Sequence, residues 1–187
     1  RIFVAEGLYI DDIFIGEKEL TIAPMESGGN YTIIGDVHID NMGQLNSNRH
    51  CTIIGASAPD VRTNTYSNLS GWTFHLNLIG CQLNYVEARS PNVILNLYHN
   101  TITHTNTVVE LWTFGDIIGN DFINNYSTSD TNELRIRNLA KSASITDHEI
   151  KILGNTFKNV RIEFNICHNT FCNQPASVLK VFKFNFI

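Results

Sequence analysis

The chain has 187 residues, of which 43% are hydrophobic, enough to bury a substantial core in a single domain. Its formal net charge is −5, and the basic residues are scattered instead of forming a stripe, so nucleic acid is not an expected partner. No apolar run is long enough for a transmembrane helix, and the histidines show no metal-binding spacing, so no membrane span, metal or other cofactor is expected.

The beginning of the chain predicts short β-strands. Apolar residues dominate residues 2–9, 13–15 and 20–22 in short alternating runs. Asp11 and Asp12 lie between the first two runs and are the only adjacent carboxylates in the chain. We expect this region to cap the domain, so the pair is not an expected catalytic site.

A short phrase recurs from residue 33 onward. It contains two or three apolar residues, a Gly or His anchor, a small or Asn position, a spacer and another apolar residue. The anchors are Gly35, Gly55, Gly80, His99, Gly119, Gly154 and His168. Most steps between anchors are 19 to 25 residues, a period typical of solenoids. The segments between the phrases are short runs rich in β-branched and aromatic residues, so each coil should contain several short strands.

Stacked coils would place equivalent residues above one another at a spacing of about 4.8 Å. Two residues before the anchor, the sequence predicts an inward aliphatic column: Ile33, Ile53, Leu78, Leu97, Ile117, Ile152 and Ile166. One residue after the anchor, four coils carry an amide that can bond to its copies above and below: Asn100, Asn120, Asn155 and Asn169.

These columns resemble those of the right-handed parallel β-helix, the pectin-lyase-like superfamily, whose repeats are of the Ile-x-Gly/Asn-Asn-x-Phe type. The resemblance implies an all-β fold, a right-handed parallel β-helix solenoid of roughly eight coils with an internal Asn ladder. It says little about activity, because this architecture serves lyases, hydrolases, esterases, epimerases, phage tailspikes, adhesins and purely structural shafts.

The domain organisation follows from the same pattern. We expect residues 1–187 to form a single β-helix domain, with the polar run 124–132 as a protruding loop. Neither end shows the polar cap that a solenoid needs, so we expect a fragment or an incomplete chain.

One strand face carries the candidate binding residues. Glu87, Glu110 and Glu133 are spaced 23 residues apart and would point outward, with Arg89, Trp112 and Arg135 each two residues further along. Trp112 with Glu110 and Arg135 is the candidate saccharide-binding site, because a flat indole ring suits a sugar ring. A catalytic alternative uses the three Glu residues with Arg89 or Arg135. A plain Glu/Arg salt-bridge ladder is the favoured interpretation of this face.

A further column offers a candidate interface. The residue immediately before the anchor is apolar in six phrases: Ile34, Ile54, Ile79, Tyr98, Ile118 and Leu153. If the preceding residue points inward, this one points outward and forms an apolar stripe suited to a homo-oligomer, for example a trimer. The alternative, that these side chains fold into the core or are covered, is equally compatible with the sequence.

Together these features predict a structural or binding module of a surface, spike or fibre-type protein that contacts glycans, with an extracellular, virion or cell-surface location. Enzymatic activity is not the favoured expectation, because no catalytic set is evident. The alternatives are a polysaccharide lyase or glycoside hydrolase of the same fold, and a homotrimeric fibre whose only task is assembly.

Overall fold

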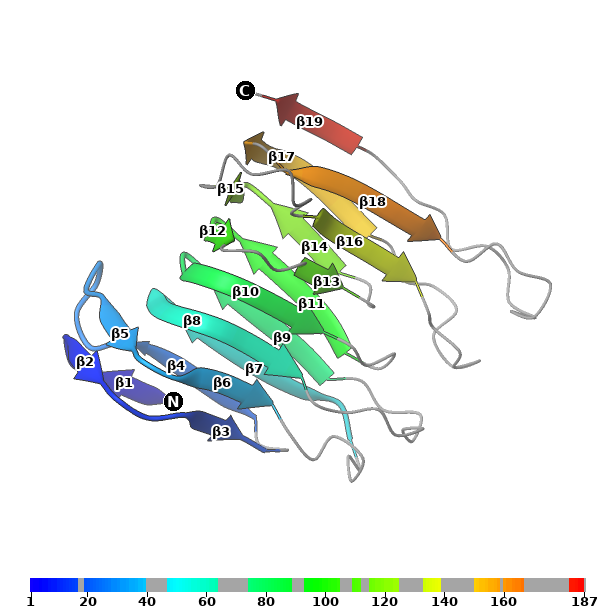
Figure 1. Cartoon of the computed structure of the whole chain (residues 1–187). Helices are drawn as coiled ribbons and strands as arrows, with labels where there is room; N and C mark the ends of the chain where they lie inside the picture. The colour runs from blue at the N-terminus through cyan, green and yellow to red at the C-terminus, as the bar shows by residue number, and fades with distance from the viewer. Residues whose placement is uncertain are drawn as a thin grey trace.

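The fold is all-β and parallel (Figure 1). A computed structural model describes residues 1–16, 19–39, 47–63, 74–88, 93–104, 109–111, 115–124, 133–138, 150–158, 160–166 and 182–186. Within these ranges the regular structure consists of strands without a helix, and the strands pair in parallel throughout. This architecture is consistent with a solenoid of the β-helix type.

The strands are short and follow one another closely. In chain order they are β1 (Ile2–Val4), β2 (Gly7–Tyr9), β3 (Ile13–Ile15), β4 (Leu20–Pro24), β5 (Tyr31–Ile33), β6 (Asp36–Ile39), β7 (Arg49–Ile54), β8 (Ala56–Thr63), β9 (Phe74–Ile79), β10 (Gln82–Ala88), β11 (Val93–Tyr98), β12 (Thr101–His104), β13 (Val109–Leu111), β14 (Gly115–Ile118), β15 (Asp121–Asn124), β16 (Glu133–Asn138), β17 (Ile150–Lys158), β18 (Arg161–Ile166) and β19 (Phe182–Phe186).

The pairings arrange these strands in three series that run from the N-terminal end to the C-terminal end of the molecule (Figure 1). The first series is β1, β4, β7, β9, β11, β14, β17 and β19. The second is β2, β5, β8, β10, β12, β15, β17 and β19. The third is β3, β6, β8, β10, β13, β16 and β18. A long strand such as β10 therefore crosses from one series to the next.

The core consists of apolar columns between the series. The first series stacks six buried aliphatic residues in register: Ile22, Ile53, Leu78, Leu97, Ile117 and Ile152. The second series stacks Phe122 on Phe157, with ring centroids 5.0 Å apart and planes 4° from parallel. Because burial of each such side chain stabilises the fold by about 1.5 to 3 kcal/mol, the columns are its main source of stability.

One member of the predicted aliphatic column lies elsewhere. Ile33 is buried, but it pairs with Tyr9 in the second series and not with the Ile53 column of the first. The reason lies in the turns. Gly35 follows a strand of the second series, whereas Gly55 follows a strand of the first, so the two phrases that look alike in sequence belong to different corners.

The first-series turns explain the Gly or His anchors. Gly55, Gly80, His99, Gly119 and Gly154 all have left-handed backbone, with φ between 55° and 66°. Glycine adopts this conformation without a steric penalty, and His99 is the one described non-glycine residue with positive φ. Each turn also bonds to the next coil; the N–H of Gly80, for example, donates to the carbonyl of Tyr98 at 2.9 Å. His168 lies outside the described residues.

Buried amides connect successive first-series turns. Asn100 Nδ2 donates to Asn120 Oδ1 at 3.0 Å, and Asn120 Nδ2 donates to Asn155 Oδ1 at 2.9 Å. The same oxygens accept backbone N–H groups, and Asn120 Nδ2 also donates to the Leu97 carbonyl at 2.9 Å. Asn169 lies outside the described residues, as does most of the predicted loop 124–132, of which only Asn124 is described, at the end of β15.

Cys81 occupies the position before these amides and bonds differently. Its backbone N–H donates to Asn100 Oδ1 at 2.8 Å, while its thiol contacts the Ile53 carbonyl at 3.6 Å. Cys81 and the core residue Cys51 are free, buried thiols. Burial raises the pKa of Cys51 to about 12 and raises that of Cys81, so both are held as neutral thiols.

Candidate functional site

The predicted Glu/Trp/Arg face lies on the third series, and its register differs from the expected spacing. Glu87 pairs with Glu110, but Glu110 pairs with Arg135, because this step spans residues 110 to 135. Glu133 lies two residues earlier and pairs with Arg161. The expected column of three glutamates is therefore wrong: two glutamates are followed by an arginine.

The structure describes only part of this predicted site. Glu87 is buried, with 8% of its surface exposed. For Glu110, Glu133 and Arg135 it describes the strand pairing, and Arg89 and Trp112 lie outside the described residues. The predicted saccharide contacts of Trp112, Glu110 and Arg135, and the catalytic alternative, stay predictions.

A set of polar residues that the sequence analysis missed lies on the same series, nearer the N-terminus. Asp12, Asp36 and Asp60 begin three equivalent strand segments: Asp36 pairs with Asp60, and the Ile13/Val37 pair places Asp12 beside Asp36. Their even spacing of 24 residues and the shared pattern of Asp, a β-branched residue, any residue and then Ile or Thr could have revealed them. Alignment on the Gly/His anchors hid this pattern, because it follows a different corner.

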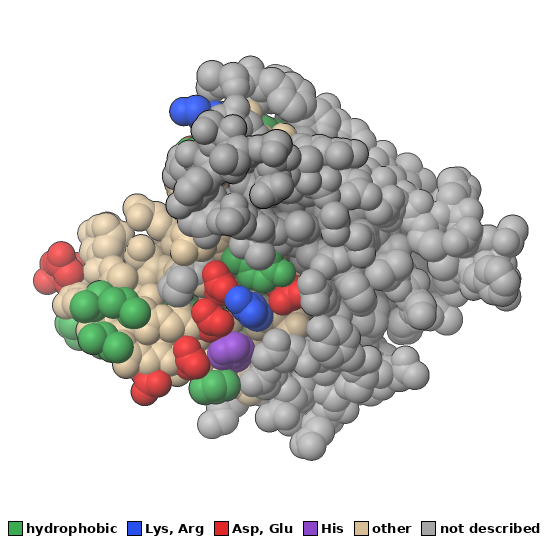
Figure 2. Space-filling view, in the orientation of Figure 1, with side chains coloured by type: hydrophobic (Ala, Val, Ile, Leu, Met, Phe, Trp, Pro, Cys, Tyr) green, Lys and Arg blue, Asp and Glu red, His purple; other side chains and the backbone are tan. Residues whose placement is uncertain are grey.

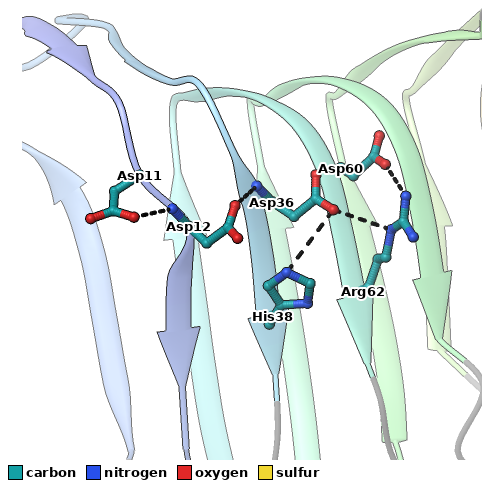
Figure 3. A network of polar contacts seen from close by, with 6 residues as sticks. All are labelled: Asp11, Asp12, Asp36, His38, Asp60 and Arg62. Carbon is teal, nitrogen blue, oxygen red and sulfur yellow. Dashed lines mark hydrogen bonds and ion pairs between the residues drawn. The ribbon is translucent and has the colours of Figure 1, made fainter.

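Arg62 links these carboxylates (Figure 3). Its Nη2 is hydrogen-bonded to Asp60 Oδ2, and its Nε lies 3.7 Å from Asp36 Oδ2. His38 Nε2 lies 4.0 Å from the same Asp36 oxygen. The hydrogen bond from Asp60 is the main reason why the pKa of Arg62 is raised. We call Asp12, Asp36, His38, Asp60 and Arg62 the polar network.

Two turns hold the N-terminal side of the polar network together. The backbone N–H of Asp36 donates to Asp12 Oδ1 at 2.8 Å (Figure 3). Gly35 allows this approach, because a Cβ atom there would lie 2.5 Å from the Asp11 carbonyl oxygen and 2.8 Å from Asp12 Oδ1. The carboxylate of Asp12 is thus held in place by the adjacent coil.

Aromatic rings flank the charged groups. The column of Phe14, His38, Arg62 and Glu87 is in register along the third series. Phe14 and His38 stack with centroids 5.0 Å apart, and the Arg62 guanidinium lies 5.3 Å from the centroid of Tyr85. Phe14 is 68% exposed, so its ring is a free apolar surface beside the charges. Figure 2 shows acidic, basic, imidazole and hydrophobic side chains gathered on this face.

The chemistry of this face is that of a polar recognition surface. Carboxylates accept hydrogen bonds, the guanidinium donates them, and the exposed ring offers an apolar plane. Among the residues that the structure describes, no group of three or more His, Cys, Asp or Glu side chains could hold a metal ion.

The predicted apolar stripe lies on the first series. Ile54, Ile79, Tyr98, Ile118 and Leu153 follow one another in register, and all are partly exposed. Ile34 is not in line with them, because it follows β5 of the second series; it is 50% exposed and donates its N–H to the Tyr9 carbonyl. The role of the stripe as an interface stays a prediction.

Comparison of the chain with known protein families, with curated proteins and with solved structures yields no match. In the part of the chain that the structure describes, no helix is long and apolar enough to span a membrane.

Proposed function

We propose that this chain is a rigid binding module, a right-handed parallel β-helix of roughly eight coils with an internal Asn ladder, of the pectin-lyase-like architecture. It serves a surface, spike or fibre-type protein and contacts glycans through the polar network and Phe14. The single observation that carries the proposal is an exposed aromatic ring stacked on His38 beside carboxylates that Arg62 links.

The rigidity of the scaffold supports a binding role. Strands in register along three series fix the spacing between Asp36 and Asp60 at one strand separation, about 4.8 Å. Their side chains need not be ordered on binding, because Arg62 already contacts both. A preorganised surface of this kind loses less conformational entropy when it binds a ligand.

The arrangement of polar and apolar groups supports a glycan as the ligand. A sugar presents hydroxyl groups at its edge and C–H groups on its face, so it suits hydrogen-bonding side chains next to an aromatic plane. Phe14 supplies the plane and Asp36 supplies oxygen acceptors.

The test compares two exposed phenylalanines. Affinity gel electrophoresis in xylan, mannan, soluble cellulose derivatives, pectate and alginate would measure retardation of the wild type, of Phe14→Ala and of Phe3→Ala. Phe3 is the matched control, because it is 58% exposed on β1 but is not part of the third series.

We expect retardation by at least one polysaccharide, weakened about tenfold by Phe14→Ala and unchanged by Phe3→Ala, since loss of about 1.4 kcal/mol of binding energy is a tenfold effect. Absence of retardation in the whole panel, or equal loss in both variants, would overturn the proposal.

A second candidate function is polysaccharide cleavage. The adjacent carboxylates of Asp36 and Asp60, with His38 and Arg62 nearby, are residue types used in acid/base catalysis. Binding remains the first proposal because Arg62 contacts both carboxylates, which favours their ionised forms as hydrogen-bond acceptors over a role as proton donor.

A further inference from the structure

A groove lies on the second series, next to the polar network but separate from it. Its volume is about 330 Å³, and it spans consecutive strands from β5 to β12. Thr32, Ser57 and Gln82 lie in one row in register across it. The turn Ile34-Gly35-Asp36 joins its edge to the polar network, so the two surfaces meet at one corner.

The polar lining of the groove is uncharged. The row of Thr32, Ser57 and Gln82 carries hydroxyl and amide groups, and a second row adds Asn84 and Thr103. Thr103 Oγ1 is 3.3 Å from Asn84 Oδ1, a hydrogen bond that orients this amide. Each of these side chains can both donate and accept hydrogen bonds, as sugar hydroxyls do.

The groove also has an apolar wall. Ile34 lines it and is 50% exposed, while Ile33, Ala58 and Leu83 form its buried floor. A concave surface with an apolar wall and a few fixed polar groups is typical of small-ligand sites. A charged ligand would lose its hydration without finding a countercharge among the lining residues, which disfavours acidic sugars there.

We propose that this groove binds an uncharged oligosaccharide. The inference rests on the proposed glycan-binding function and deepens it, because it assigns the ligand class and a second surface. The sugar lies along the row of Thr32, Ser57 and Gln82, its hydroxyls bonded to these side chains and one face against Ile34. A chain that continues over the corner would reach the polar network and Phe14.

The experiment titrates the whole chain with cellohexaose, mannohexaose and maltohexaose as neutral probes and with oligogalacturonate of the same length as the acidic probe, by isothermal calorimetry. Thr32→Lys places a long charged side chain in the groove. Thr156→Lys is the matched control, because Thr156 continues the same outward row beyond the groove. Gln82→Ala removes an amide at an exposed position where misfolding is not expected.

We expect at least one neutral hexamer to bind, Thr32→Lys and Gln82→Ala to weaken it about tenfold, and Thr156→Lys to leave it unchanged, since a tenfold change corresponds to about 1.4 kcal/mol. Binding of oligogalacturonate alone, or neutral binding that Phe14→Ala weakens and the groove variants do not, would overturn the groove and leave the proposed function standing. If none of the probes binds the wild type and the polysaccharide gels also fail to retard it, both proposals fall.

Discussion

At the residue scale, the buried amides show how a polar group stabilises an apolar interior. Asn120 is fully buried, yet both Oδ1 and Nδ2 have partners in the coils on either side. A buried amide without partners would cost about 1 to 3 kcal/mol for each unmet group. These bonds tie the left-handed turns of successive coils to one another.

Replacement of Asn120 by Ala tests this role. The change leaves the Asn100 N–H and the Leu97 carbonyl without their side-chain partner, so we expect a loss of about 3 to 5 kcal/mol in the free energy of unfolding by urea. Asn77→Ala is the control: Asn77 bonds to Thr52 and Asn96 on the half-exposed outer row, where water can replace it, and should lose less than about 1 kcal/mol. Similar losses in both variants would contradict the account.

His99 and Gly119 form a second residue-scale test. A Cβ atom at Gly119 would lie 2.6 Å from His99 Nδ1, whereas one at Gly154 would meet nothing within 4 Å, although both glycines have φ near 60°. We expect Gly154→Ala to lose about 1 to 2 kcal/mol from left-handed strain alone, and Gly119→Ala to lose more.

The double variant His99→Gly/Gly119→Ala isolates the clash. Removal of the imidazole should return the loss at Gly119 to that of Gly154→Ala, measured by urea unfolding as a double-mutant cycle. Strict additivity of the two changes would show that the ring does not limit this position.

At the element scale, the strand pattern could be predicted where one turn type repeats. The Gly or His anchors share left-handed φ, so the aliphatic column from Ile53 onward followed from sequence. The third series could not be placed in this way, because its strands follow other corners and a varying number of residues precedes each. That is why Asp36 and Asp60 were missed and Glu133 was put in the wrong column.

The apolar stripe of the first series also belongs to this scale. If it mediates self-association, Ile54→Lys should dissociate the oligomer into monomers, because a buried unpaired ammonium is strongly unfavourable. Thr52→Lys, two residues earlier on the same face of β7, should leave the mass unchanged. Multi-angle light scattering measures both. A wild-type monomer would remove the stripe from consideration as a homo-oligomer interface.

At the scale of the whole molecule, the neutral core predicts a weakness in alkali. Burial raises the folded-state pKa of Cys51 from 9.0 to about 12 and that of Cys81 in the same direction. Below about pH 9 both states hold the thiol proton, so the contribution is complete. As the pH rises toward 12, the unfolded chain releases the proton first and stability falls.

Cys51→Ala should flatten this decline even if it lowers the starting stability through loss of packing. Thermal unfolding followed between about pH 8 and pH 11 would measure the slope for wild type and variant. Identical slopes would show that the thiols do not account for the alkaline loss.

The central claim is that the molecule binds a glycan without cleaving it. The most direct measurement incubates the wild type and Asp60→Asn with each retarding polysaccharide and follows the chain length by size-exclusion chromatography. We predict that the polysaccharide is bound and keeps its length with both proteins. Shortened chains produced by the wild type and absent with Asp60→Asn would contradict the account and establish an enzyme that uses the polar network.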